Sequence, residues 1–542
     1  MWTHVFPGPG PPQMGHEEHR LAFSTRALRS LTPWAAGAGL LLGLHALALG
    51  RVPPGLASDP AVEALRGLRL VAERRLEILT VSIGPSAETL FLYLSGASLA
   101  IFGPVRWALA VPTILASVAT ALLTARFARR ARPALPLSVA LLLPASSLWL
   151  FHYGQVGLRA AAAPLFLLVT VFLLDDANGS RLAAHPRAAG AVMALSLYAY
   201  SGCRLLPIAW AALVAWRAVK WPSLRPGLAA EARRVGLAFL LVSIPNILLL
   251  LRAPDAVLSR GYYVDRGGLT DKLANVAATF LLPFGTPDRY RVWRGDGHVF
   301  DMTGVALTVS GVDPIDPVAA ALAVLGILAL ARRRASNGLS FLFIAWAAGS
   351  VLLGAFGPSL TRLLILVPAW IVFAAVGADA LLASAPRLRL PLATFLGVWL
   401  LLRAEAYAVT FGSSGAAAWA FHQRVTAMGE RARDLSSAGS RVLLVARTGR
   451  DVVKYFCWRR IENVYLVTPA AAFPSRGEAP LDGFAPDVVL VEDDADFEGW
   501  GESVGLVRSG ARPGFTEYVR PGPAHLPTVR SNLWRLWSPM SL

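Results

Sequence analysis

Two carboxylates lie beside apolar segments near the start of the chain. Asp59 follows the first long apolar segment, and Glu88 directly precedes a shorter one. A carboxylate at a membrane boundary can take a proton from an attacking hydroxyl, which is general base catalysis. The alternative is a structural role for Asp59, because Asp followed by Pro60 is a good cap for a helix that starts there. Residue type favours the cap, although one side chain can serve both roles.

Basic and aromatic residues recur at the ends of apolar segments on the side where Asp59 lies. Arginine binds phosphate through its planar set of donors, so these residues could hold an anionic lipid phosphate. The alternative is that the cations reach lipid headgroups and the tyrosines form an interfacial belt. The candidates for lipid-phosphate or substrate binding are Tyr153, Arg159, Tyr200, Arg204, Lys272 and Arg362.

Motifs for several other chemistries are missing from the sequence. There is no Walker, zincin or serine-hydrolase motif. Two cysteines cannot build a disulfide framework or a Cys-rich metal site, and the histidines lack metal-ligand spacing. We therefore assign no metal ligands and no definite cofactor, and leave a divalent cation open.

The composition is that of an integral membrane protein. Of the 542 residues, 55% are hydrophobic and only 16% are charged, whereas a soluble domain has about 25% charged residues. The mean hydropathy is +0.52. A net charge of +17 fits basic cytoplasmic loops, and the chain shows no compact basic face with aromatics that would indicate nucleic-acid binding.

Apolar segments of spanning length recur along the chain. A spanning helix needs about 20 mainly apolar residues. The segment Thr89–Phe102 is shorter, and counting it as a span would move the following arginine clusters outside, so we expect a helix on the outer membrane surface. The eleven predicted spans are roughly 33–50, 107–127, 134–151, 157–174, 188–202, 204–219, 235–251, 316–331, 339–356, 361–383 and 390–411.

Lysine and arginine in short loops set the predicted orientation. They place the N-terminus in the cytoplasm and the C-terminus outside. The Ala- and Arg-rich composition suggests a bacterium of high genomic GC, and we expect a multi-pass protein of its cytoplasmic (inner) membrane. The C-terminal part alternates helices and strands, which indicates a small α/β domain. The predicted parts are a disordered cytoplasmic tail at 1–32, a membrane domain at 33–411 with long outer loops at 51–106 and 252–315, and an extracytoplasmic α/β domain at 412–542.

The ordered series of segments resembles the membrane-embedded C-type glycosyltransferases (GT-C fold). It looks most like the bacterial branch related to protein O-mannosyltransferases and lipid A aminoarabinose transferases, which is similar to glycosyltransferase family 39. The resemblance covers most of residues 33–411. The matching stretches are PPGLASDPAVEALRGLRL, ETLFLYLSGASLAIFGPVRWALAVPTILASVATALLTARFARR, WLFHYGQVGLRAAAAPLFLL, LSLYAYSGCRLLPIAW and DPIDPVAAALAVLGILALARRR.

This resemblance implies a reaction. A sugar on a polyprenyl phosphate in the outer leaflet passes, with inversion, to an acceptor hydroxyl of a glycan, lipid or protein. Asp59 matches the family's acidic position as general base, and Glu88 matches a second acidic residue. Arg204 and Arg362 fall where similar proteins often have arginine at the outer ends of spans.

The sequence departs from the family at two places. Many relatives have Asp-Glu where this chain has Asp59-Pro60, and often Arg-Glu-Pro where it has Ala87-Glu88-Thr89. The missing carboxylate and arginine bear on metal binding, acceptor choice and activity.

Two other functions remain open from sequence. One is a non-catalytic protein of the same fold that binds polyprenyl lipid or assists envelope assembly. The other is a transporter, although transporters place ionisable residues at mid-membrane and often contain inverted repeats. The predicted spans are nearly free of central charge, which favours the transferase.

Overall fold

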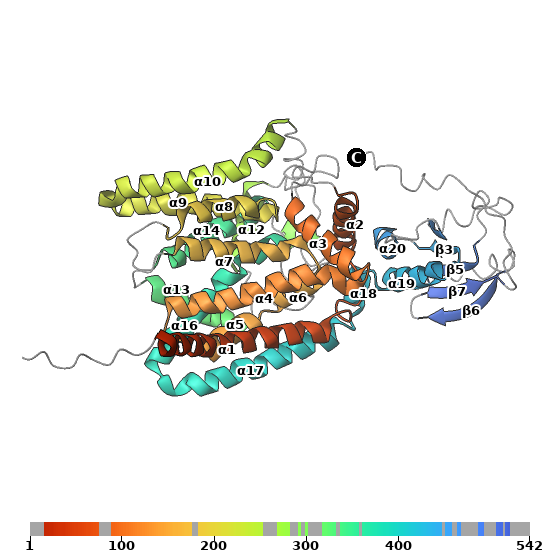
Figure 1. The fold of residues 1–542 in the computed structure, drawn as a ribbon, viewed down its shortest axis with the longest axis horizontal. Coiled ribbons are helices and arrows are strands. Elements are labelled where there is room, and N and C mark those ends of the chain that lie inside the picture. The colour runs from red at the N-terminus through yellow and green to blue at the C-terminus, as the bar shows by residue number, and fades with distance from the viewer. Residues whose placement is uncertain are drawn as a thin grey trace, which may run out of the picture.

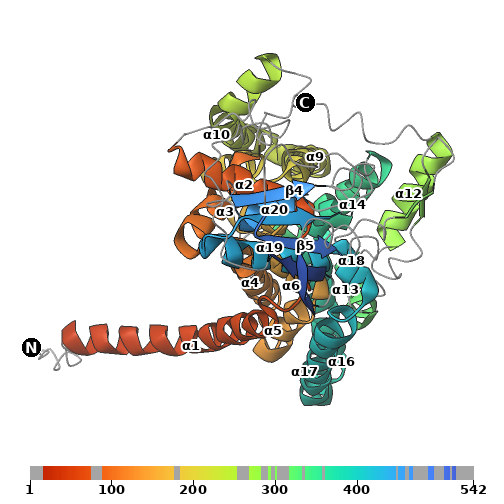
Figure 2. The same ribbon diagram turned by 90° about the vertical axis from the view of Figure 1, so that its right-hand side faces the viewer.

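A bundle of helices carries a small strand-containing unit at one end (Figures 1 and 2). The computed structural model describes residues 16–74, 88–175, 183–252, 268–281, 291–293, 299–301, 317–331, 336–356, 360–446, 450–457, 463–467, 486–492, 506–512 and 515–520.

The helices of the bundle run side by side in Figure 1. Their bounds are α1 His16–Ala48, α4 Arg106–Ala131, α5 Leu137–Ala145, α6 Leu148–Val156, η1 Arg159–Ala162, α7 Ala163–Leu174, α8 Pro186–Ser196, η2 Ser201–Arg204, α9 Leu205–Lys220, η3 Pro222–Leu224, α10 Arg225–Arg252, α12 Leu269–Leu281, α13 Pro317–Ala331, α14 Asn337–Phe356, α15 Leu360–Leu363, η6 Leu364–Leu366, α16 Val367–Ser384, η7 Pro386–Leu388, α17 Arg389–Glu405 and the π-helical turn η8 Ala406–Phe411. A strand pair, β1 Arg291–Trp293 and β2 Val299–Asp301, lies in the second long loop.

Several of these helices can cross a bilayer by length and composition. Among the described residues, six do so alone, and the pair α5 and α6, bent by 52°, makes a seventh if it is one span. The chain is thus a membrane protein, as predicted, while eleven spans stay a prediction. The six are Arg106–Ala131, Ser201–Lys220, Arg225–Arg252, Asn337–Ala355, Thr361–Ser384 and Pro386–Phe411.

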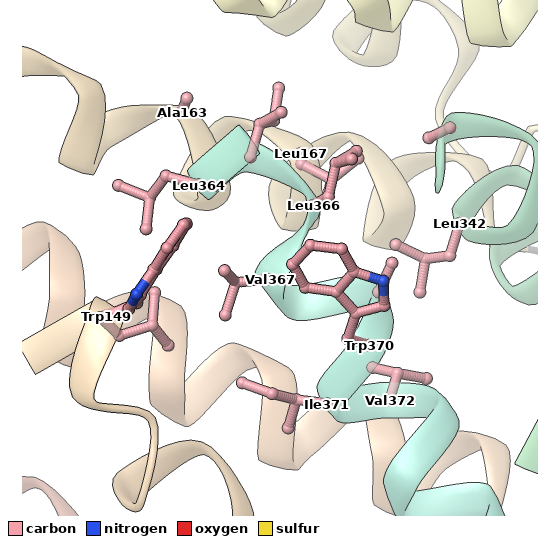
Figure 3. Close-up of a cluster of buried hydrophobic side chains, with 14 of the residues drawn as sticks. Trp149, Ala163, Leu167, Leu342, Leu364, Leu366, Val367, Trp370, Ile371 and Val372 are labelled. Carbon is pink, nitrogen blue, oxygen red and sulfur yellow. The ribbon is translucent and has the colours of Figure 1, made fainter. Parts of the chain in front are cut away.

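The bundle is built around α16, in which every residue from Val367 to Ala378 is buried. Figure 3 shows Val367, Trp370 and Ile371 of this helix among apolar side chains from α6, α7 and α14. Trp149 of α6 packs on one side and Leu342 of α14 on the other. An apolar helix surrounded by other helices is the expected centre of such a bundle.

Two helices lie at the end of the bundle that carries the strands. The helix α2 (Ser58–Ala72) runs crosswise to the long helices in Figure 1, and α3 (Thr89–Phe102) packs against it. The two cross at glycines: a Cβ on Gly67 would lie 2.1 Å from the Leu92 carbonyl oxygen, and one on Gly96 would lie 2.2 Å from the Gly67 carbonyl oxygen. The 14 residues of α3 are fewer than a span needs, and its position on the outer surface stays a prediction.

The C-terminal unit is an α/β fold, as the sequence predicts. Its sheet has the order β4-β3-β5-β7-β6, in which β4, β3 and β5 are parallel and β7 and β6 are antiparallel to their neighbours. The elements are α18 Gly415–Ala420, α19 Gln423–Ser437, β3 Val442–Val445, α20 Arg450–Phe456, β4 Val464–Val467, β5 Val488–Glu492, β6 Val507–Arg512 and β7 Phe515–Val519.

This unit packs directly on α2. The apolar face of α2 (Ala61, Ala64 and Leu68) shares one buried cluster with residues of α19, α20 and the sheet. Polar contacts fix the same interface: Tyr455 Oη donates to the Val105 carbonyl oxygen at 2.8 Å, and the Leu56 N–H donates to Thr426 Oγ1 at 3.0 Å. The helix α2 is therefore held between the bundle and the C-terminal unit.

The structure corrects two expectations. The helix α1 begins at His16, so residues 16–32 of the predicted disordered tail are helical; Glu17 and Glu18 near its start favour a helix N-terminus. The predicted cap role of Asp59 is wrong, because α2 begins at Ser58, its N-cap is Ala57, and Asp59 lies in the first turn.

The crossing of α2 and α3 predicts a sensitive position. Replacing Gly67 by alanine should lower the thermal unfolding temperature in detergent, because the new methyl group collides with backbone; overpacking costs about 1–3 kcal/mol. Gly39→Ala is the control, since a Cβ there has nothing within 4 Å. Tryptophan fluorescence melts test this, and equal unfolding temperatures for the two variants would contradict the close crossing.

Candidate functional site

A buried arginine between two carboxylates forms the centre of the site. The Nη1 atom of Arg159 pairs with Oε1 of Glu63, and its Nε pairs with Oε2 of Glu88. The exposed fractions are 8% for Arg159, 5% for Glu63 and 3% for Glu88. Two carboxylates share one cation, so these three residues together carry one surplus negative charge.

Helix ends and turns bring these three side chains together. Glu63 lies on α2 four residues before Gly67, so the glycine crossing sets its position relative to α3. Glu88 is the N-cap residue of α3, but its side chain does not cap that helix. Its Oε1 instead accepts the Ser201 N–H at 2.6 Å, and the Leu90 N–H donates to the Tyr198 carbonyl oxygen at 2.9 Å. The start of α3 is thereby tied to the turn before α9.

That turn carries a tyrosine that extends the site toward α15. Tyr200 is buried and forms a side-chain hydrogen bond with Thr361, and the charges of Glu88, Arg159 and Arg362 act on it. A phenol hydroxyl can donate a hydrogen bond, so Tyr200 supplies a donor beside these charges.

Asp59 stands above this buried cluster. It precedes Glu63 by one helical turn, so both lie on the same side of α2, and its charge acts on Arg159. Its side chain is exposed and makes no hydrogen bond or ion pair with the described residues. An exposed carboxylate that is held in place by a rigid buried cluster is suited to accept a proton.

The remaining predicted residues differ in how closely they join the cluster. Tyr153 is 1% exposed and its charge interaction with Tyr200 places it nearby; its hydroxyl has no hydrogen-bond partner in the described structure. Arg204 ends the turn that begins at Ser201, and its side chain is exposed. Lys272 lies on α12, which packs along α14 and lies away from α2 in both views (Figures 1 and 2).

Three contributors to this cluster do not stand out in the sequence. Glu63 has one signal, its spacing of four residues from Asp59, which puts both on one helix face. Ser201 contributes only its backbone N–H, which every residue type except proline supplies. Thr361 is next to Arg362 in the chain, but nothing in its type predicts a bond to Tyr200.

The described residues contain no group of three or more His, Cys, Asp or Glu side chains that could hold a metal ion. The carboxylates that do meet, Glu63 and Glu88, are bound to Arg159.

The helical bundle, the crosswise helices and the C-terminal α/β unit define a GT-C fold, which confirms the fold expected from sequence. A crystal structure of ArnT, a lipid A aminoarabinose transferase, from Cupriavidus metallidurans bound to undecaprenyl phosphate is similar to the chain. The likeness covers 91% of this chain and 100% of that one, with a TM-score of 0.53 and 11% identity. The apo state gives a TM-score of 0.49 and 12% identity over the same coverage. No protein-family profile and no curated protein matches the sequence.

Removing the central cation should destabilise the protein. Arg159→Gln leaves two buried carboxylates without their counter-ion, and breaking a buried pair in this way costs about 3–5 kcal/mol. We expect a lower thermal unfolding temperature in detergent. Arg204→Gln is the matched control, since that side chain is exposed. An Arg159→Gln protein with the same unfolding temperature as the wild type would show that the ion pairs do not stabilise the packing of α2 and α3 on the bundle.

Proposed function

We propose that the protein transfers a sugar from a polyprenyl-phosphate donor to an acceptor hydroxyl on the extracytoplasmic side of a bacterial inner membrane. The observation that carries the proposal is the exposed Asp59, one helical turn from a carboxylate fixed in the buried Glu63–Arg159–Glu88 cluster. The GT-C fold is consistent with it.

Asp59 is the general base in this proposal. Its carboxylate takes the proton of the acceptor hydroxyl while the hydroxyl oxygen attacks the anomeric carbon. The bond from that carbon to the phosphate oxygen breaks, and the polyprenyl phosphate leaves with the electron pair. Attack from the side opposite the leaving group inverts the configuration, so one base suffices.

The leaving phosphate needs donors and positive charge. Arg362 and Arg204 supply cations on the α15 and η2 turns, and Arg362 is close enough to act on Tyr200. The hydroxyls of Tyr153 and Tyr200 add donors, and the Tyr153 hydroxyl is buried without a partner in the described structure. A buried hydroxyl without a partner costs about 1–3 kcal/mol, which a phosphate oxygen would relieve.

The contacts of the predicted residues indicate which of them take part in the reaction and which hold the site in place. Glu88 binds Arg159 and the Ser201 N–H, which favours a positioning role over a role as second base. Arg159 is occupied by two carboxylates, which favours the same role for it over direct phosphate binding. The Asp59 carboxylate is then the group left to accept the proton.

The proposed donor lipid is supported by a similar solved structure. The similar ArnT structure contains bound undecaprenyl phosphate, and we propose the same class of lipid here. The acceptor is a glycan, lipid or protein hydroxyl on the same side as Asp59. Comparing the envelope glycans and lipids of cells with and without the protein would identify the sugar and the acceptor.

Asp59→Asn should abolish transfer and leave lipid binding intact. The amide cannot take the proton, and loss of a general base lowers rates about 10²–10⁴-fold. Proteoliposomes with radiolabelled sugar lipids from cell membranes measure the transfer. Glu73→Gln is the matched control, because Glu73 lies at the other end of α2 and pairs with Arg69 at the surface.

Two results would separate the alternatives. Full transfer by Asp59→Asn would remove Asp59 as base. Binding of undecaprenyl phosphate by the wild type, with unchanged envelope glycans in cells that lack the protein, would favour the non-catalytic lipid-binding protein.

Arg204→Gln and Arg362→Gln should each weaken binding of undecaprenyl phosphate. A charge-assisted hydrogen bond is worth about 1.5–3 kcal/mol, or about 10–100-fold in the dissociation constant. Quenching of tryptophan fluorescence by titrated undecaprenyl phosphate measures it. Arg69→Gln, on the exposed surface of α2, should bind as the wild type does, and equal binding by all four proteins would exclude both arginines from the phosphate site.

A further inference from the structure

A cavity of about 220 Å³ lies on the flank of the bundle, away from the ion-pair cluster. It is bordered by α1, by the bend between α5 and α6, and by the end of α17 with its π-helical turn. Figure 1 shows α1 and α17 along the same edge of the bundle. We call this cavity the α1–α17 groove. Its lining residues are Leu44, Leu47, Ala48, Ala145, Ser146, Leu148, Phe151, Leu400, Arg403, Ala404, Glu405, Tyr407 and Ala408.

The floor of the α1–α17 groove is apolar. Leu400, Ala404 and Ala408 recur at every fourth position of α17 and η8, so they form one stripe. Leu47 on the rim is 72% exposed, which is the exposure expected of a side chain that faces lipid. Such a groove suits part of an acyl chain.

Irregular helices border the groove. The helix bends by 52° between α5 and α6, and α17 passes into a π-helical turn, a feature frequent at functional sites. Behind the groove, Tyr407 Oη and His152 Nδ1 lie 3.0 Å apart, and the His45 ring stacks on Phe151 at 4.4 Å between centroids. These contacts make the inner wall, so the groove faces the membrane rather than the bundle centre.

Two opposite charges flank the floor. Arg403 and Glu405 stand on either side of Ala404 and both line the groove. The groove lies near the end of α17 that leads to the C-terminal unit, and lipid headgroups gather at the ends of spanning helices. The guanidinium suits a phosphate, and the carboxylate suits an ammonium. Charged side chains in spanning helices are costly and mark functional contacts.

We propose that the α1–α17 groove binds one phospholipid with a zwitterionic amine headgroup, of the phosphatidylethanolamine class. Its phosphate pairs with Arg403, its ammonium pairs with Glu405, and one acyl chain lies along Leu400, Leu44 and Phe151. An anionic headgroup without an amine would meet repulsion from Glu405, so the charge pair also gives selectivity. The groove lining includes none of the residues proposed to bind the donor.

Native mass spectrometry of the full chain in detergent, with phosphatidylethanolamine or phosphatidylglycerol added, tests the proposal. Ala404→Trp fills the floor, and Leu401→Trp is the matched control, since Leu401 is 66% exposed and outside the lining. We expect the phosphatidylethanolamine adduct to fall at least about tenfold in Ala404→Trp and to persist in Leu401→Trp. Ala48→Leu narrows the groove from α1 and should act in the same direction if Ala404→Trp does not fold.

The charge pair gives a second measurement. Glu405→Gln should remove the preference for phosphatidylethanolamine over phosphatidylglycerol, and Arg403→Gln should weaken both. Equal adducts in Ala404→Trp, Ala48→Leu and Leu401→Trp, or no preference in the wild type, would overturn the proposal. Displacement of phosphatidylethanolamine by an equal amount of undecaprenyl phosphate would overturn it too, and would assign the groove to a polyprenyl chain.

Discussion

The ion cluster of Arg159 with Glu63 and Glu88 is the constraint on which the site depends. The three charged side chains come from three separate segments of the chain. A fourth segment joins them through the Ser201 N–H, which donates to Glu88. Burying ions is costly, and such pairs often add little net stability compared with apolar packing. Their effect is geometric, because each partner can be satisfied in only one arrangement. The cluster therefore fixes where α2, α3, η1 and the turn before α9 meet.

The glycine crossing of α2 and α3 and the ion cluster act together. Gly67 and Gly96 let the two backbones touch, which brings the helices that carry Glu63 and Glu88 close enough to share one guanidinium. Asp59 sits one turn earlier on the same helix, so its position follows from both contacts. A carboxylate on a loop would have no such support, and positioning within a fraction of an ångström is what catalysis requires.

The sequence predicts the bundle well because a span is a local signal, readable from some 20 consecutive residues. It also places Glu88, Arg159, Tyr200 and Arg362 at one end, since charge in the loops sets orientation. It does not reveal that Glu88 binds Arg159, because pairing between distant segments depends on helix packing. By residue type, Asp59 followed by Pro60 indicates a helix cap. In the structure α2 begins one residue earlier, at Ser58, so Asp59 lies inside the helix. No apolar alternation marks the strand β6, because all its residues are exposed.

The burial of α2 between the bundle and the C-terminal unit has a consequence for how the chain is made. The Leu56 N–H bonds to Thr426, 370 residues further along the chain. At about 5–20 residues per second, ribosomes need roughly 20–70 s to synthesise that distance. Throughout that interval the C-terminal unit, which covers the apolar face of Ala61, Ala64 and Leu68, has not yet been synthesised. A chaperone or the lipid surface must shield α2 until the last fifth of the protein emerges, so biogenesis in this protein is completed from its C-terminal end.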